Sequence, residues 1–223
     1  MIFELSRTSE FPDPRLAQPN GFYAVGGDLS PERLIKAYPL GIFPYFAFRE
    51  EPLIWWAPQD RFVIYTDEIH VSHSMRNLIN RNCYECTIDE DFHGVITGCA
   101  TAQGRIEEEN AWLGPELIRT WCELNARGHA KSVEVWDREG YLVGGLYGFV
   151  CGGCFIGDSM FSLEKGASKL ALIHLARYMN RQGGSFIDCQ LRTEHLESMG
   201  ARFIPYEEYL KETLKDNIID WNL

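Results

Sequence analysis

The amino-acid sequence predicts an α+β fold, and three observations support that prediction. From about residue 61 onward, apolar runs of strand length alternate with helical apolar patterns. Several strand patterns follow one another as an antiparallel meander, and a strand–helix–strand unit comes after them. Residues 1–60 lack this regularity and hold most of the ten prolines. We therefore expect a small N-terminal α/β domain over residues 1–60 and a larger domain over residues 61–223.

Within residues 1–60, one helix and two aromatic segments can be assigned. Ser30 is suited to cap a helix that starts at Pro31 and continues to Tyr38. The aromatic segments are residues 42–46 and 53–56. They indicate either a small core packed on the larger domain or a stacking surface for a base or ring, and both interpretations stay open.

The elements of the larger domain follow from the spacing of apolar residues and from Gly and Pro at the boundaries. We expect strands over 61–65, 84–88, 132–136, 142–150, 154–161 and 185–190, and helices over 72–81, 92–101, 115–127, 167–182 and 206–214. This order is that of an acetyltransferase-like (GCN5-related) domain. Such domains bind the coenzyme A pyrophosphate at a loop before a helix, but Leu163, Glu164 and Ser168 depart from that loop's pattern. We expect no coenzyme A and no other cofactor.

Composition excludes several classes of protein. The formal net charge of −11 argues against broad nucleic-acid binding, which depends on clustered Lys and Arg. No apolar run approaches the roughly 18 residues of a membrane span. The first residues have no basic region followed by an apolar core, so we expect no signal peptide and a cytoplasmic protein.

Seven cysteines include two Cys-x-x-Cys pairs, Cys83/Cys86 and Cys151/Cys154. The pairs lie much farther apart than the roughly 15–20 residues of a two-knuckle zinc site. Gly152-Gly153 between the second pair is typical of a hairpin turn. We expect buried or incidental thiols and no metal.

The stretch with the clearest chemical signal runs from residue 151 to residue 190. Asp158 interrupts an apolar strand pattern, and Asp188 and Gln190 end the next one. Residues two apart on a strand point to the same face, which predicts that Asp188 and Gln190 act together. Ligands bind where the strands of open α/β sheets end or separate. We therefore expect the active site here.

Ten short strings occur in order along the chain: GGDLSP, GIFPYF, WWAP, HVSHSM, SVEVW, GGLYG, GDSMFS, ASK, IDCQ and SMGA. Together they resemble the leucyl/phenylalanyl-tRNA–protein transferase family, roughly from Gly26 to Ala201. The resemblance implies an enzyme that moves Leu or Phe, and possibly Met, from aminoacyl-tRNA to the N-terminal Arg or Lys of a protein. That reaction is an N-end rule step that marks the protein for degradation.

The resemblance also implies roles for polar residues. Gln190 would donate its amide to the developing oxyanion, and Asp188 would orient the incoming amine by its charge. Asp158 stands where the family more often has Glu, and it would bind the amino group of the aminoacyl moiety or the cationic acceptor. Because the Asp side chain is one methylene shorter, a bridging water could take part in that contact.

For the donor, the resemblance implies an apolar pocket and two aromatic residues near the adenosine, Trp112 and Tyr45. Leu175 and Met179 replace Phe residues that the family tends to have, which could alter donor preference. The pocket residues are Leu146, Phe155, Met160, Leu172, Leu175, Met179 and Ile187. Considered singly, each of these is more simply interpreted as core.

The family's basic cluster for tRNA falls on residues 73–81, where only Arg76 and Arg81 remain, together with His73. We expect weaker or more salt-sensitive tRNA binding, limited to the acceptor end. Two alternatives stay open. The chain could be a divergent aminoacyl- or acyltransferase with another donor or acceptor, or a noncatalytic module that binds tRNA or a degron.

Overall fold

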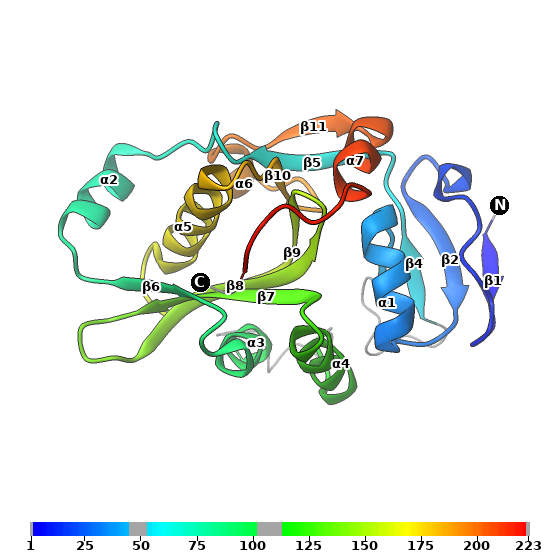
Figure 1. The fold of residues 1–223 in the computed structure, drawn as a ribbon, viewed down its shortest axis with the longest axis horizontal. Coiled ribbons are helices and arrows are strands. Elements are labelled where there is room, and N and C mark those ends of the chain that lie inside the picture. Colours follow the sequence, from blue (N-terminus) through cyan, green and yellow to red (C-terminus); the bar gives the residue numbers. More distant parts are fainter. Residues whose placement is uncertain (1, 45–52, 102–112, 222–223) are drawn as a thin grey trace.

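The computed structural model describes residues 2–44, 53–101 and 113–221. It is a mixed α+β structure with two separate sheets, shown in Figure 1. The smaller sheet has the order β1-β2-β4-β3 and the larger one the order β11-β5-β10-β9-β8-β7-β6. Among the described residues, no helix combines the length and apolar character that crossing a membrane requires.

The smaller sheet is built from short strands of the N-terminal segment. They are β1 (Phe3–Leu5), β2 (Phe22–Gly26), β3 (Phe43–Pro44) and β4 (Ile54–Trp56). β1 pairs with β2 in parallel, and the other pairs are antiparallel. Strands of two to five residues show too little alternation for their positions to be predicted, so the sequence predicts an α/β domain here but assigns bounds only to its helix.

That helix is α1 (Pro31–Ala37), which Ser30 caps by accepting a hydrogen bond from the backbone N–H of Arg33. A short 3₁₀ turn, η2 (Tyr38–Leu40), continues it, as predicted by the helical pattern up to Tyr38. The C-terminal helix α7 (Tyr206–Thr213) holds this turn. The Tyr209 hydroxyl donates to the Tyr38 carbonyl at 3.0 Å, and the Thr213 hydroxyl donates to the Pro39 carbonyl at 2.8 Å.

The larger sheet and its helices contain every element predicted for residues 61–223, with boundaries that differ by at most two residues. Its strands are β5 (Asp60–Tyr65), β6 (Glu85–Ile88), β7 (Ala130–Trp136), β8 (Leu142–Cys151), β9 (Cys154–Ser162), β10 (Phe186–Asp188) and β11 (Arg202–Pro205). Its helices are α2 (His73–Asn80), α3 (Phe92–Thr101), α4 (Pro115–Ala126), α5 (Ala167–Arg181) and α6 (Glu194–Glu197). The hairpin predicted at Gly152-Gly153 joins β8 to β9. β11 and α6 were not predicted.

Helices cover both faces of this sheet: α3 and α4 lie on one side and α5 on the other (Figure 1). Alternating side chains of β8 accordingly belong to different cores. Tyr147 and Phe149 join the cluster with α3, α4 and the N-terminal segment, whereas Leu146 and Val150 join the cluster with α5. Period-two alternation therefore sends one strand's apolar residues to two cores.

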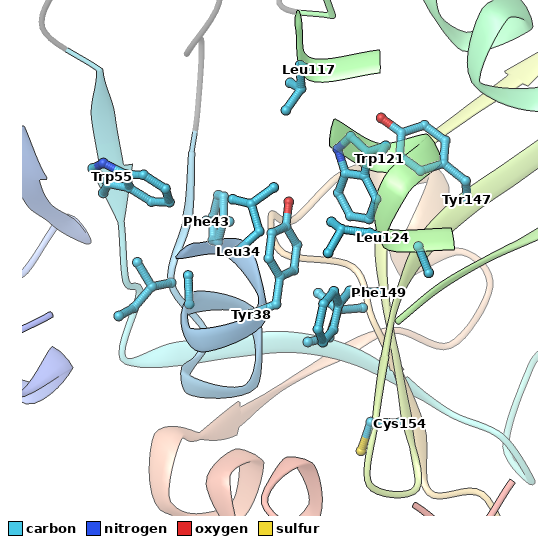
Figure 2. Close-up of a cluster of buried hydrophobic side chains, with 14 of the residues drawn as sticks. Leu34, Tyr38, Phe43, Trp55, Leu117, Trp121, Leu124, Tyr147, Phe149 and Cys154 are labelled. Carbon is cyan, nitrogen blue, oxygen red and sulfur yellow. The ribbon is translucent and has the colours of Figure 1, made fainter. Parts of the chain in front are cut away.

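Figure 2 shows how the first of these cores joins the two sheets. Tyr38 lies between Leu34 and Phe43 of the N-terminal segment on one side and Trp121, Tyr147 and Phe149 on the other. Its ring stacks on Phe149 at 5.2 Å between centroids and meets the Trp121 ring edge-on at 5.3 Å. Such aromatic pairs stabilise beyond their buried area by roughly 0.5–1.5 kcal/mol each. This packing fixes where the Tyr38 hydroxyl points.

Candidate active site

A well-formed cavity lies where two parallel strands separate. β9 and β10 are the parallel pair in a sheet whose other pairs are antiparallel, and their pairing ends at Asp188 opposite Ile156. Beyond that point a cavity of about 370 Å³ opens, within the range of small-ligand sites. The sequence predicted a site where these strands end, and the cavity is found there.

Its lining is mostly apolar and includes a few polar side chains. The apolar lining includes Leu146, Phe155, Met160, Leu172, Ile187, Leu191 and Leu196. The polar residues include Asp158, Asp188, Gln190 and Thr193. Eight residues proposed from the sequence thus border one cavity, including all three polar candidates.

Four further candidates lie elsewhere. Leu175 and Met179 do not border the cavity: both are fully buried in the core under α5, one and two turns beyond Leu172. Because each helical turn advances about 5.4 Å, these positions are carried away from the cavity end of the helix. Arg76 and Arg81 are exposed on and just after α2, apart from the cavity. Tyr45 and Trp112 lie outside the described residues.

A bulge in β9 sets the position of Asp158. Tyr147 of β8 pairs with Ser159, but the next residue, Gly148, pairs with Gly157, so Asp158 has no partner opposite it. An extra residue of this kind bends the strand and redirects a side chain. The close approach needs glycine, since a Cβ at Gly148 would lie 2.1 Å from the Ile156 carbonyl oxygen. The bulge thereby turns the Asp158 carboxyl into the cavity wall.

Two buried tyrosines hold the Asp158 carboxyl in place. The Tyr38 hydroxyl donates to Oδ1 at 2.6 Å, and the Tyr147 hydroxyl donates to Oδ2 at 2.8 Å. Burial raises the pKa of Asp158 from 3.8 to about 6, although hydrogen bonds from Tyr38 and Tyr147, and the nearby Gln190 amide, lower it. At neutral pH this side chain is a carboxylate that accepts a proton far more readily than an ordinary Asp does.

Asp188 has a different environment from the one expected. Its side chain is fully buried, as is that of Arg61, and its Oδ2 accepts a hydrogen bond from Arg61 Nη2 in an ion pair. Its Oδ1 accepts the backbone N–H of Gln190 at 2.9 Å. Arg61 also donates to the Gly41 carbonyl at 2.9 Å, and its guanidinium lies over the Tyr209 ring. Both carboxylate oxygens of Asp188 are thus engaged by the protein.

The predicted strand over 185–190 ends earlier than expected, at Asp188. Gln190 has φ = +59°, a left-handed conformation that few non-glycine residues adopt. The interpretation that Asp188 and Gln190 share one strand face is therefore wrong, because the backbone turns between them. Such backbone strain is typical of functional sites.

The Gln190 side chain borders the cavity with an unused donor. Its Nε2 is buried and has no hydrogen-bond partner within the described part of the chain. A buried amide without a partner costs roughly 1–3 kcal/mol, which a ligand acceptor would recover. The cavity therefore combines an apolar region, a hydrogen-bond donor and a carboxylate of raised pKa.

Sequence reasoning missed Arg61, Tyr38 and Tyr147. Arg61 begins an apolar strand and looks like an ordinary strand-edge cation, while the two tyrosines belong to patterns that predict core. For the described residues, no group of three or more His, Cys, Asp or Glu side chains is arranged to hold a metal ion. Burial raises the pKa of both Cys151 and Cys154, as expected of buried thiols.

Comparison with known proteins assigns a family. The family model described as leucyl/phenylalanyl-tRNA protein transferase matches residues 63–214, and the model of that family's N-terminal domain matches residues 27–59. Proteins named leucyl/phenylalanyl-tRNA–protein transferase align over most of the chain. The one from Syntrophus aciditrophicus is 48% identical, over 93% of this chain and 86% of its own length. The one from Edwardsiella ictaluri is 44% identical, over 96% and 87%.

Solved structures resemble the chain only weakly. L-PGS from Bacillus licheniformis has a TM-score of 0.41 and 14% identity, over 82% of this chain and 61% of that chain. A conserved protein of unknown function from Bacteroides thetaiotaomicron has a TM-score of 0.45 and 13% identity, over 70% and 55%.

Proposed function

The chain belongs to the leucyl/phenylalanyl-tRNA–protein transferase family, and from this premise we propose how its cavity performs the reaction. Its function is that of an aminoacyltransferase, which transfers an aminoacyl group from tRNA to a protein N-terminus in N-end rule degradation. The observation that carries the mechanism is the buried, unpartnered Nε2 of Gln190 beside the raised-pKa carboxyl of Asp158.

The apolar region of the cavity is proposed to hold the donor side chain. Leu146, Phe155 and Leu172 form an apolar wall. Such a wall suits donor side chains that are apolar and unbranched at Cβ, namely Leu and Phe, with Met as a further donor. Side chains branched at Cβ would meet the wall near the ester. Discrimination by shape alone is worth roughly 1–3 kcal/mol per methylene, so we expect preference rather than absolute selection.

Gln190 is proposed to stabilise the transition state. When the acceptor nitrogen attacks the ester carbonyl, negative charge develops on the carbonyl oxygen. The unused Nε2–H of Gln190 is placed to donate to that oxygen, and a donor of this kind contributes about 10²–10³ in rate in other enzymes. Asp188 and Arg61 act through Gln190, since the Asp188 carboxylate holds the Gln190 backbone N–H. We therefore assign Asp188 a positioning role in place of direct contact with the amine.

Asp158 is proposed to receive the acceptor amine. The new C–N bond forms as the ester C–O bond breaks, and one amine proton must reach the leaving ribose oxygen. The acceptor attacks as the neutral amine, whose nitrogen becomes acidic as the C–N bond forms. An Asp158 carboxylate with a pKa of about 6 can take that one proton and return it to the leaving oxygen. Among the described lining residues, Asp158 is the carboxylate that no cation neutralises. Its charge also supports an acceptor with N-terminal Arg or Lys.

We further propose that residues 1–60 and 61–223 are two domains, the second acetyltransferase-like, in a cytoplasmic protein. The two separate sheets support the division, and so do the two family models, which end and begin at residues 59 and 63. A parallel pair of strands that separates within a mostly antiparallel sheet supports the acetyltransferase-like assignment.

The test is a transfer assay with radiolabelled Leu-, Phe- and Met-tRNA. Acceptor peptides begin with Arg, Lys or Ala and are otherwise identical. We expect label on the Arg and Lys peptides, strongly reduced transfer to the Ala peptide, and loss of transfer on Gln190→Ala. Equal labelling of all three peptides would refute the proposed acceptor preference.

A further inference from the structure

A second cavity lies on the other side of α5 from the active site. It has a volume of about 250 Å³ and is bordered by α2, the start of β6 and α5. Leu78, Ile79, Leu170 and Ile173 form its apolar part. The remaining lining residues are Asn82, Cys83, Tyr84, Cys86, His174, Arg177 and Arg181. Nothing in the proposed mechanism uses this cavity.

Its rim carries uncompensated positive charge. Arg177 and Arg181 are four residues apart on α5, so they occupy the same helix face, and both are exposed. Neither forms an ion pair within the described residues, and the cavity lining includes no Asp or Glu. One carboxylate lies behind the wall, where Glu164 accepts the Tyr84 hydroxyl.

A third arginine comes from the hairpin between β7 and β8. Arg138 Nη2 lies 3.4 Å from the carbonyl oxygens of Arg81 and Asn82, and Asn82 itself lines the cavity. These contacts place Arg138 and Arg81 at the same end of the molecule as the cavity. Elsewhere Arg15, Arg127 and Arg202 pair with carboxylates, as expected for a chain of net charge −11. By contrast, Arg76, Arg81, Arg138, Arg177 and Arg181 form no ion pair with any residue that the structure describes.

The pKa of His174 is also affected by the positive charge around this cavity. Burial lowers the pKa of His174 below its ordinary value, and the charges of Arg181 and Arg177 lower it further. A cation is thus disfavoured at this position, whereas an anion is favoured. The cavity combines an apolar floor with guanidinium groups, and guanidinium groups bind phosphate in a bidentate manner.

We propose that this cavity binds the sugar–phosphate backbone of the donor tRNA, with Arg177 and Arg181 on a phosphate and the apolar floor against the adjoining nucleoside. The proposal rests on the proposed function, which supplies the tRNA. α5 carries Leu172 in the wall of the active-site cavity and His174 in the wall of the second. The two cavities are separated by about one helix diameter, roughly 10–12 Å, which a few nucleotides span. An RNA whose aminoacyl end enters the first cavity is therefore within reach of the second.

The experiment compares a whole tRNA with a short donor. The variant Arg177→Gln/Arg181→Gln is assayed with Phe-tRNA and with phenylalanyl-adenosine, a donor that carries no phosphate and therefore cannot contact the second cavity through one. Arg119→Gln is the matched control, because Arg119 is exposed on α4 and forms no ion pair within the described residues. We expect kcat/KM for Phe-tRNA to fall roughly tenfold or more at about 0.1 M salt. Transfer from phenylalanyl-adenosine should not change, and the control should behave as wild type with both donors.

Binding of uncharged tRNA against salt gives a second readout that does not need catalysis. Loss of the contact to this phosphate should reduce the slope of log K against log salt by about 0.7–0.9. Arg177→Lys/Arg181→Lys keeps the charges, so it should retain most of that slope. An unchanged slope and unchanged Phe-tRNA kinetics would overturn the proposal. So would an equal loss with both donors, which would place the two arginines in the active site or the fold. Failure of the wild type to transfer from either donor would refute the proposed function, while the binding slopes would still decide on the cavity.

Discussion

Asp158→Asn should make the protein more stable and less active at neutral pH. The side chain keeps its size, and the amide can still hydrogen-bond with the hydroxyls of Tyr38 and Tyr147. What disappears is a buried negative charge. Functional sites commonly retain groups that destabilise the fold, and Asp158 is proposed to be one of them.

The magnitude follows from the pKa of Asp158. A rise from 3.8 to about 6 corresponds to about 3 kcal/mol at 1.36 kcal/mol per pKa unit. Because the folded state holds this proton more tightly than the unfolded state, the contribution of Asp158 is most favourable below pH 3.8. It is lost as the pH rises through 6, with a slope near −1.36 kcal/mol per pH unit. The Asn variant does not titrate here, so its advantage should grow between about pH 4 and pH 6 and then level off.

The assay is urea unfolding of both proteins from pH 4 to pH 8, analysed as the difference in unfolding free energy. The difference is needed because exposed carboxylates such as Glu68 and Glu207, whose pKa values neighbouring arginines lower, give the opposite pH dependence in both proteins. Tyr38→Phe is the second variant: it removes a hydrogen bond that lowers the pKa of Asp158, so that pKa should rise further.

The rate profile tests the same charge independently. Wild-type kcat/KM should rise through pH 6 as Asp158 ionises and again near pH 8 as the acceptor amine loses its proton. In Asp158→Asn, kcat/KM should no longer rise near pH 6. In Tyr38→Phe, that rise should occur at a higher pH. A variant difference in unfolding free energy that is flat from pH 4 to pH 8 would refute the argument, as would an unaltered rise of kcat/KM near pH 6.

Three other perturbations test the rest of the site. Gln190→Ala should lower kcat for Phe transfer about 10²–10³-fold with little change in KM, and an unchanged kcat would remove Gln190 from the transition state. Arg61→Met should destabilise the fold by about 3–5 kcal/mol in chemical unfolding, because it leaves the Asp188 carboxylate buried without its cation. Adding Asp188→Asn to it should recover much of that loss, and simple additivity of the two changes would contradict the coupling. Leu146→Phe should shorten the apolar part of the cavity and reduce kcat/KM for Phe-tRNA by roughly 10-fold or more relative to Leu-tRNA; equal reduction for both donors would argue against that placement of the side chain.

The larger sheet could be predicted because its elements are long and strongly patterned. β8 and β9 run for ten and nine residues, and α5 for fifteen, so each shows its period several times. The strands of the smaller sheet have two to five residues and depend on contacts with distant segments. β1, for example, pairs with β2 across the η1 turn (Pro14–Leu16), which no local pattern encodes.

The same distinction applies to the site. Asp158 and Asp188 were recognisable because a carboxyl group interrupts or ends an apolar strand, where burial is costly without a purpose. Tyr38 and Arg61 were not recognisable, because their partners lie 120 and 127 residues away. The role of Asp188 also depended on its unseen partner. Without Arg61 in view, an acid beside Gln190 is most simply interpreted as facing the substrate.

The buried pair of Arg61 and Asp188 is best understood as support for a strained residue. Gln190 keeps a left-handed backbone that costs of order 1–3 kcal/mol, and it keeps an amide without a partner. If the loop after β10 could move, the Gln190 backbone would leave the left-handed conformation and its side-chain amide would find a hydrogen-bond partner. The Asp188 carboxylate prevents this by accepting the Gln190 N–H, and Arg61 fixes the carboxylate while it also donates to the Gly41 carbonyl, three residues before Pro44 of the cavity wall. One guanidinium thus couples the N-terminal segment to Gln190, so that the energy of folding holds this residue in place for its proposed role as the donor to an oxyanion that exists only during the reaction.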